Sequence, residues 1–169
     1  MLFYLVPMTL KRSQKLIKNS YMNYIIVILT FVSLNVQAQS DEAAVKHTIN
    51  SLFEGMKKSD TALMRLAFSK DAMLQTITKT KEGNTLVRSE VVDSFLVAIA
   101  RPHPEIYEER ISFEVVKIDA DLAIAWTPYK FYVGEKFSHC GVNSFQLVKF
   151  NGEWKIQYLI DTRRRQGCE

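Results

Sequence analysis

The chain has 169 residues, of which 47% are hydrophobic, so it is long and apolar enough for one folded domain and is not a disordered segment. Its net charge of +4 comes from Lys11, Arg12, Lys15 and Lys18, because no acidic residue precedes position 39. The other 18 Lys and Arg residues match the 18 Asp and Glu residues, so charge gives no support for nucleic acid as a partner.

Residues 1–38 are predicted to be a leader with a signal peptide. After the four basic residues no charge appears before Asp41, and the interval contains the apolar run YIIVILTFVSL. Val36 and Ala38 occupy the −3 and −1 positions of a small-residue cleavage site, and Met22 offers an alternative start. A membrane anchor would need about 20 apolar residues, roughly twice this run. We therefore expect a periplasmic or secreted protein that meets a membrane only through its uncleaved signal peptide.

Residues 39–169 are predicted to form a single domain that begins with helices. Ser40 and Asp60 are suitable N-caps, and apolar residues recur at helical spacing after the first of them. The two prolines of RPHPE stop the third helix. The expected order is a helix within 40–60, a helix at 61–68, a strand at 71–80 and a helix at 90–100.

The second half of the domain is predicted to be a meander of long strands. Short turns separate alternating apolar segments, and Asn151-Gly152 is the strongest hairpin signal because type I′ turns require positive φ at both positions. The predicted strands are 109–119, 121–133, 136–150 and 153–163. The chain is therefore predicted to be an α+β domain with helices covering one face of a curved antiparallel sheet.

Turn lengths predict which side chains share a face. Two-residue turns at Gly134-Glu135 and Asn151-Gly152 would place Asn143 between Trp126 and Ile160. The predicted helix-facing set is Leu122, Ile124, Trp126, Phe137, His139, Asn143, Phe145, Leu147, Trp154, Ile156, Tyr158 and Ile160. The predicted outer set is Cys140, Ser144, Gln146, Lys155, Gln157, Asp161 and Arg163. Glu114 would face inward with a three-residue turn at 119–121 and outward with a two-residue turn.

The C-terminal segment WTPYKFYVGEKFSHCGVNSFQLVKFNGEWKIQYLIDTRR resembles the nuclear transport factor 2-like superfamily and its secreted bacterial branch. The resemblance covers about residues 41–165, and its motif runs from Phe145 to Ile156. It implies a cone of helices and curved sheet around a pocket, with homodimers formed through the outer sheet face. Its relatives include ketosteroid isomerase and cyclases of the SnoaL type. Neither the isomerase pattern of a Tyr with two acids nor an Arg with paired Asp can be placed from the sequence, so no catalytic residues are carried over.

Three residues are candidates for catalysis. His139 changes its charge near neutral pH and could act as an acid or base. Asn143 could donate to a substrate carbonyl, and Glu114 could act as a general base if it faces inward. Each also has a structural interpretation, as a hydrogen-bonded His, an Asn that satisfies a neighbouring backbone group, and a surface Glu.

Four aromatic residues, Trp126, Tyr129, Phe131 and Tyr158, are predicted to line a ligand site, although alternating aromatic residues are also ordinary core. The three His residues lack metal-ligand spacing, so neither a metal nor another cofactor is expected. In an oxidising compartment Cys140 and Cys168 would form a disulfide worth about 3 kcal/mol, or else they remain free thiols.

Three functions remain open at this stage. The first is a protein that binds a small apolar organic ligand without catalysis. The second is an isomerase, cyclase or lyase that moves a proton with His139. The third is a dimeric interaction module whose core is filled by its own side chains.

Overall fold

The computed structural model describes residues 40–168. The predicted leader, with its alternative start at Met22 and its cleavage site at Ala38, lies outside these residues. Within the described residues, no helix has both the length and the apolar character that a membrane span requires.

Three helices precede most of the sheet, as the sequence predicts. The first covers residues 40–58. The second, α2 (Thr61–Ala67), begins at the predicted cap, because the Asp60 side chain accepts a 3.0 Å hydrogen bond from the Leu63 backbone N–H. The third, α3 (Val92–Ala100), begins two residues later than expected, because the residues before it belong to a strand.

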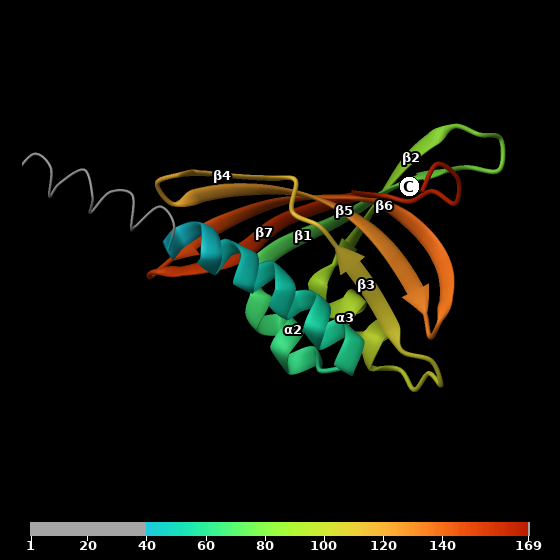
Figure 1. Ribbon diagram of the computed structural model, residues 1–169, viewed down its shortest axis with the longest axis horizontal. Helices are drawn as coiled ribbons and strands as arrows, with labels where there is room; N and C mark the ends of the chain where they lie inside the picture. The colour runs from blue at the N-terminus through green and yellow to red at the C-terminus, as the bar shows by residue number, and fades with distance from the viewer. Residues whose placement is uncertain (1–39, 169) are drawn as a thin grey trace, which may run out of the picture. The chain divides into compact units, whose positions relative to one another are not determined.

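A seven-stranded sheet carries these helices on its concave side (Figure 1). The strand order is β2-β1-β7-β6-β5-β3, and β4 pairs with β5 beside β3. The strands are β1 (Phe68–Lys79), β2 (Thr85–Val91), β3 (Tyr107–Ile111), β4 (Val115–Asp119), β5 (Leu122–Val133), β6 (Lys136–Phe150) and β7 (Glu153–Thr162). All neighbours are antiparallel except β1 and β7, which run parallel. The predicted α+β class is confirmed.

Strand β2 was not predicted from the sequence. Its sequence, TLVRSEV, does not alternate between apolar and polar residues as a half-buried strand does, and all seven residues are exposed. It pairs with β1 as a hairpin that extends away from the helices (Figure 1).

The β6–β7 hairpin follows the predicted register only near its turn. Asn151 and Gly152 have φ values of 51° and 86°, and Leu147 lies opposite Ile156 as expected. An extra residue on β7, Gln157, then forms a bulge that moves the partner of Asn143 from the predicted Ile160 to Asp161.

The faces of β7 beyond this bulge are therefore the reverse of those predicted. Asp161 is only 7% exposed and borders the interior, as does Arg163, whereas both were predicted on the outer face. Tyr158 and Ile160, which were predicted to face the helices, are partly buried residues on the opposite side of the strand.

A second bulge reverses the faces of β5. Ser138 is the extra residue on β6, so Phe131 lies opposite His139, and Thr127 replaces the predicted Trp126 opposite Asn143. Four residues predicted on the helix-facing side are consequently exposed, namely Leu122 (50%), Ile124 (42%), Trp126 (45%) and Phe137 (39%). The small residues Ala123 and Ala125 face the helices instead and are 0% and 2% exposed.

Glu114 does not face inward. The β4–β5 turn has two residues, with Asp119 opposite Leu122, and this places Val115 rather than Glu114 opposite Trp126. The predicted strand 109–119 is interrupted at 112–114, and Glu114 is exposed at this break.

The core lies between the helices and the inner sheet face. It is built from residues that are almost fully buried, among them Ile49, Leu52, Met64, Phe145, Leu147 and Ile156. Burying each such side chain contributes about 1.5–3 kcal/mol, so this cluster is the main stabilising feature of the domain.

The C-terminal segment is attached to the outer face of β6. Cys140 and Cys168 form a disulfide with a Cα–Cα distance of 5.8 Å. The backbone groups of Cys140 and Arg164 also exchange two 2.9 Å hydrogen bonds. These contacts hold the chain in place immediately after Arg163, whose side chain borders the interior.

Candidate functional site

A cavity of about 480 Å³ lies between the helices and the concave sheet face. Its apolar lining comes from the first helix, α3 and four strands, and consists of Leu52, Phe53, Met56, Leu74, Phe95, Ala98, Ile99, Tyr107, Phe131, Val133 and Leu159. Its polar lining consists of Gln75, Thr76, Glu90, Glu109, Tyr129, His139, Asn143, Asp161 and Arg163. The cavity is thus mostly apolar with a limited number of convergent polar groups, which is typical of small-molecule sites.

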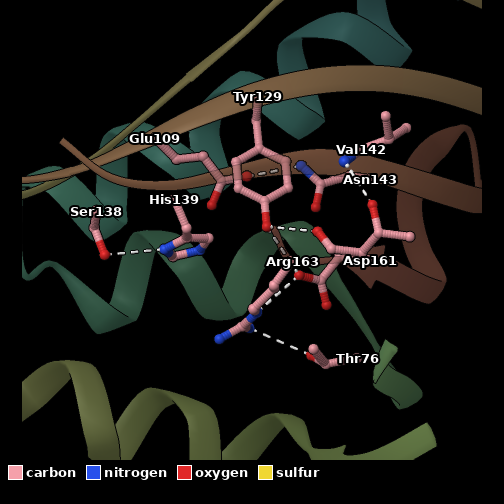
Figure 2. A network of polar contacts seen from close by, with 10 residues as sticks. Thr76, Glu109, Tyr129, Ser138, His139, Val142, Asn143, Asp161 and Arg163 are labelled. Carbon is pink, nitrogen blue, oxygen red and sulfur yellow. Dashed lines mark hydrogen bonds and ion pairs between the residues drawn. The ribbon is translucent and has the colours of Figure 1, made fainter. Parts of the chain in front are cut away.

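Glu109 and Asn143 form the first polar contact of the cavity. Tyr107, Glu109 and Ile111 alternate along β3, so Glu109 shares its face with two partly buried apolar residues. The Asn143 side chain, 3% exposed, donates a 2.7 Å hydrogen bond from Nδ2 to Glu109 Oε1 (Figure 2). Burial raises the pKa of Glu109 to about 7, against the opposing effect of the Asn143 hydrogen bond. The Glu109 carboxyl can therefore hold or release a proton near neutral pH.

Tyr129, Asp161 and Arg163 form the second polar cluster (Figure 2). The Tyr129 hydroxyl lies 3.2 Å from Asp161 Oδ2 and 2.8 Å from the carbonyl oxygen of Thr162, and it donates to both. Arg163 Nε donates to Asp161 Oδ2 at 2.9 Å. Burial, and then the Asp161 charge, raise the pKa of Tyr129 above its ordinary value, so its hydroxyl remains a donor at neutral pH.

His139 lies on the same side of the sheet, against aromatic rings. Its ring stacks on Phe131 at a centroid distance of 4.9 Å and meets Tyr129 edge-on at 5.7 Å. Its Nδ1 is 3.1 Å from the Ser138 hydroxyl oxygen. Burial, followed by the charge of Arg163, lowers the pKa of His139, so the imidazole is neutral at pH 7.

Gly141 makes the position of Tyr129 possible. These two residues are cross-strand partners, and a Cβ added at Gly141 would lie 2.7 Å from Tyr129 Cε1 and would collide with the Thr162 carbonyl oxygen. Only glycine leaves room for the ring to cross β6 and for its hydroxyl to reach β7.

A second depression, of about 660 Å³, lies between the first helix and β3. It is larger than the cavity but is bordered mainly by surface residues, such as His47, Asn50 and Lys57. Phe53 and Glu109 border both spaces. We assign the site to the smaller cavity because the buried polar clusters lie there, and Glu109 forms part of the wall between the two.

The predicted site residues divide into two groups by position. His139, Asn143, Tyr129 and Phe131 all line the cavity. Glu114 and Trp126 are exposed and do not line it. Tyr158 does not line it either, and its hydroxyl donates to Oε1 of Gln75, a residue at the edge of the cavity, at 2.6 Å. The catalytic and ligand-binding roles of all seven stay predictions.

Among the cavity residues that sequence reasoning missed are three that carry charge, Glu109, Asp161 and Arg163. The alternation of Tyr107, Glu109 and Ile111 was a usable signal for the first. The other two were hidden by the bulge at Gln157, which no sequence pattern marks. The cavity therefore contains a tyrosine, Tyr129, together with two carboxyl groups, Glu109 and Asp161. This grouping could not be located from the sequence. Among the described residues, no group of three or more His, Cys, Asp or Glu side chains gathers as a metal site.

The fold and this helix-covered cavity define the nuclear transport factor 2-like class, and solved structures agree. A nuclear transport factor 2-like protein of unknown function from Shewanella baltica is 19% identical with a TM-score of 0.58, covering 75% of this chain and 96% of its own. A conserved protein from Planctomyces limnophilus is 19% identical with a TM-score of 0.61, covering 75% and 98%. The beta subunit of a putative aromatic-ring-hydroxylating dioxygenase from Novosphingobium aromaticivorans is 14% identical with a TM-score of 0.61, covering 75% and 90%.

Within this class, residues 40–158 match the family model described as "Putative lumazine-binding", and the chain belongs to that family. No curated protein matches the chain in sequence. At identities below one fifth, the structural relatives establish the fold and nothing about activity.

Proposed function

We propose that the protein binds a small organic molecule, with a flat apolar body and polar groups along one edge, inside the 480 Å³ cavity. The observation that carries this proposal is the separation of the lining into two parts. Phe53, Phe95 and Phe131 supply apolar ring surface, while Glu109–Asn143 and Tyr129–Asp161 supply hydrogen-bonding groups. A fully occupied hydrophobic core would not require buried polar pairs beside an unfilled volume.

The family description makes lumazine a suitable first probe. Lumazine is a flat bicyclic heteroaromatic compound whose rings carry both hydrogen-bond donors and acceptors along their edges. Such a molecule could stack against phenylalanine rings and exchange hydrogen bonds with the Asn143 amide and the Glu109 carboxyl.

The test is a fluorescence titration with lumazine and, as a second neutral probe, 2-naphthylmethanol, together with native mass spectrometry of protein from its own host. Ala98→Phe should abolish binding because Ala98 lines the cavity. Ala100→Phe, an exposed change two residues further along α3, should leave binding intact. Absence of both a co-purified compound and saturable binding of either probe would refute the proposal.

A second function, proton transfer on the bound molecule, is favoured by one observation. Glu109, with a pKa of about 7, sits in a cavity that also presents the Tyr129 hydroxyl as a donor. This pairing suits an isomerase, cyclase or lyase, with Glu109 rather than His139 as the exchanging group. Solvent-deuterium exchange into a bound ligand tests it: exchange should require Glu109 and survive His139→Gln.

Export and self-association complete the proposal. The apolar run and cleavage motif of residues 1–38 support export, and a mature mass that begins at Gln39 would test it. The exposed side chains Leu122, Ile124 and Trp126 on the outer sheet face support a homodimer. Light scattering of wild type and Trp126→Glu tests the dimer, which the charge should dissociate.

A further inference from the structure

The carboxyl groups that border the cavity differ in whether a cationic side chain forms an ion pair with them. Asp161 accepts from Arg163 Nε at 2.9 Å, so this buried acid is neutralised within the protein. Glu109 receives its hydrogen bond from a neutral amide, that of Asn143, and none of the ion pairs among residues 40–168 includes it. Buried charges in proteins are normally paired. The charge of Arg163 acts on Glu109, but Arg163 forms its ion pair with Asp161, so Glu109 has no ion-pair partner of its own among residues 40–168.

The neighbouring residue on the same strand provides the contrast. Glu108 points to the other side of β3, where Lys57 and Arg110 both bind its carboxylate. The Lys57 contact, and then that of Arg110, lower the pKa of Glu108, whereas burial raises that of Glu109. Glu108 is therefore held in two ion pairs, whereas Glu109 is in none among residues 40–168 and feels the charge of Arg163 only at longer range.

The surroundings of Glu109 suit a cation that arrives with a ligand. Phe131 is its direct cross-strand partner on β5, and Tyr107 lies two residues before it on the same face. These two rings are 5.9 Å apart and both line the cavity. Aromatic faces attract organic cations, and more strongly where water is excluded. His139, stacked behind Phe131, cannot supply the charge because it is neutral at pH 7.

We infer that the ligand carries a single positive charge, and that its ammonium group pairs with Glu109 while its aromatic body lies against Phe131 and Tyr107 in the cavity. This inference rests on the proposed function and names the chemical class of its ligand: an aromatic amine that is protonated at neutral pH. The other charged groups of the lining also favour a cationic ligand. Glu90 adds a second unpaired acid to the Asp161–Arg163 pair, so the lining is net negative when Glu109 is ionised.

Binding of such a cation is coupled to proton release. Free Glu109 is largely protonated below about pH 7, and the ammonium group can pair only with its ionised form. Affinity for the cation should rise as pH increases through 7. The other titratable groups that line the cavity with Glu109 are Asp161 from β7, Arg163 immediately after β7, Tyr129 from β5, His139 from β6, Tyr107 from β3 and Glu90 from β2. In the depression on its other side they are His47, Glu54 and Lys57 from the first helix and Glu108 from β3. Arg163 is paired with Asp161 in the structure, and Tyr129 stays protonated across this range because its pKa is raised.

A matched pair of probes tests the inference: 2-naphthylmethylamine, which is an ammonium ion at pH 8, and its neutral analogue 2-naphthylmethanol. Wild-type protein should prefer the amine by about tenfold or more, the range expected for a charge-assisted hydrogen bond. Glu109→Gln should abolish this preference while keeping an acceptor for Asn143. Glu108→Gln, the same change one residue away, should preserve it.

The outcomes separate this inference from the proposed function. If the alcohol or lumazine binds and the amine gains nothing, the cation inference is wrong and the binding function stands. If no probe binds and no compound co-purifies, both the cation inference and the binding function are wrong. Should Glu109→Gln not fold, calorimetry of wild type in two buffers of different ionisation enthalpy decides the matter. At pH 6.5 the amine should release more than about half a proton and the alcohol none, and equal proton release by the two would contradict the inference.

Discussion

Asn143 on β6 and Glu109 on β3 share a 2.7 Å hydrogen bond that passes over β5, the strand between them. The contact is possible because β5 presents small or flat side chains beneath it, Thr127 opposite Asn143 and Phe131 opposite Glu109. An amide donor fixes the orientation of the carboxyl without supplying a charge. The same bond therefore positions Glu109 and leaves it free to change its protonation state.

The first prediction follows from the pKa of Glu109. It is about 7 in the folded protein and 4.5 without the fold, so the folded state holds the proton more tightly. Stability should therefore fall as pH rises from 4.5 to 7, by up to about 3 kcal/mol. Glu109→Gln should match wild type at pH 4 and exceed it in stability at pH 8, as measured by urea unfolding.

His139 acts in the opposite direction over an overlapping range, because its lowered pKa makes stability rise with pH up to about its ordinary value of 6.5. The difference between wild type and Glu109→Gln cancels this contribution. Glu108→Gln is the control, since that acid is paired outside the cavity. A constant difference between wild type and Glu109→Gln from pH 4 to 8 would mean that Glu109 has an ordinary pKa.

The second prediction concerns the Tyr129 hydroxyl. Tyr129→Phe removes the donor to Asp161 Oδ2 and to the Thr162 carbonyl, and Tyr129 and Asp161 are only 4% and 7% exposed. The free energy of unfolding should decrease by about 1–3 kcal/mol, the cost of a buried acceptor that loses its partner. Tyr107→Phe is a suitable comparison, because within residues 40–168 no hydrogen bond of its hydroxyl is present, and it should change stability by less than about 0.5 kcal/mol. Similar losses in the two variants would show that the Tyr129 hydroxyl contributes nothing.

Much of the fold follows from local signals in the sequence. The long strands β5, β6 and β7 and the turn at Asn151-Gly152 lie where alternation and turn chemistry predict them. The inward positions of His139 and Asn143 were also predicted. These two positions were predicted correctly because the turn at Asn151-Gly152 determines which side chains of β6 face inward, back to the bulge at Ser138. Both residues lie within that part of β6.

The errors arise where one extra residue reverses which side chains of a strand face the core. Ser138 and Gln157 are ordinary strand residues in composition, yet each is the extra residue of a bulge. The rule that larger apolar side chains face the core also failed on β5, where the bulge at Ser138 turns Ala123 and Ala125 inward, at 0% and 2% exposed, and leaves Trp126 45% exposed. Such a choice depends on tertiary packing, and the sequence of one strand does not contain it.

The third prediction tests the close approach at Gly141. Gly141→Ala places a methyl group against the Thr162 carbonyl and 2.7 Å from the Tyr129 ring, so the ring and β7 must move apart. We expect a loss of about 3 kcal/mol or more in a thermal or urea unfolding experiment, together with a weaker Tyr129–Asp161 contact. Gly83→Ala is the control: it has no atom within 4 Å of the added Cβ, and its cost is limited to backbone strain at a φ of 86°. Equal losses in the two variants would disprove the packing explanation.

The fourth prediction links the disulfide to the cavity. Cys140 and Cys168 close a loop of 28 residues, and the backbone of Arg164 is held against Cys140, directly beside the Arg163 that pairs with Asp161. Cys168→Ala should cost about 3 kcal/mol of unfolding free energy, and a reductant should destabilise wild type by the same amount without affecting the variant. Because release of the C-terminal segment frees Arg163 from its position, the variant should also bind 2-naphthylmethanol less tightly than Gln166→Ala, which alters the same segment but keeps the bond. Unchanged affinity in Cys168→Ala, with the expected loss of stability, would restrict the disulfide to a purely structural role.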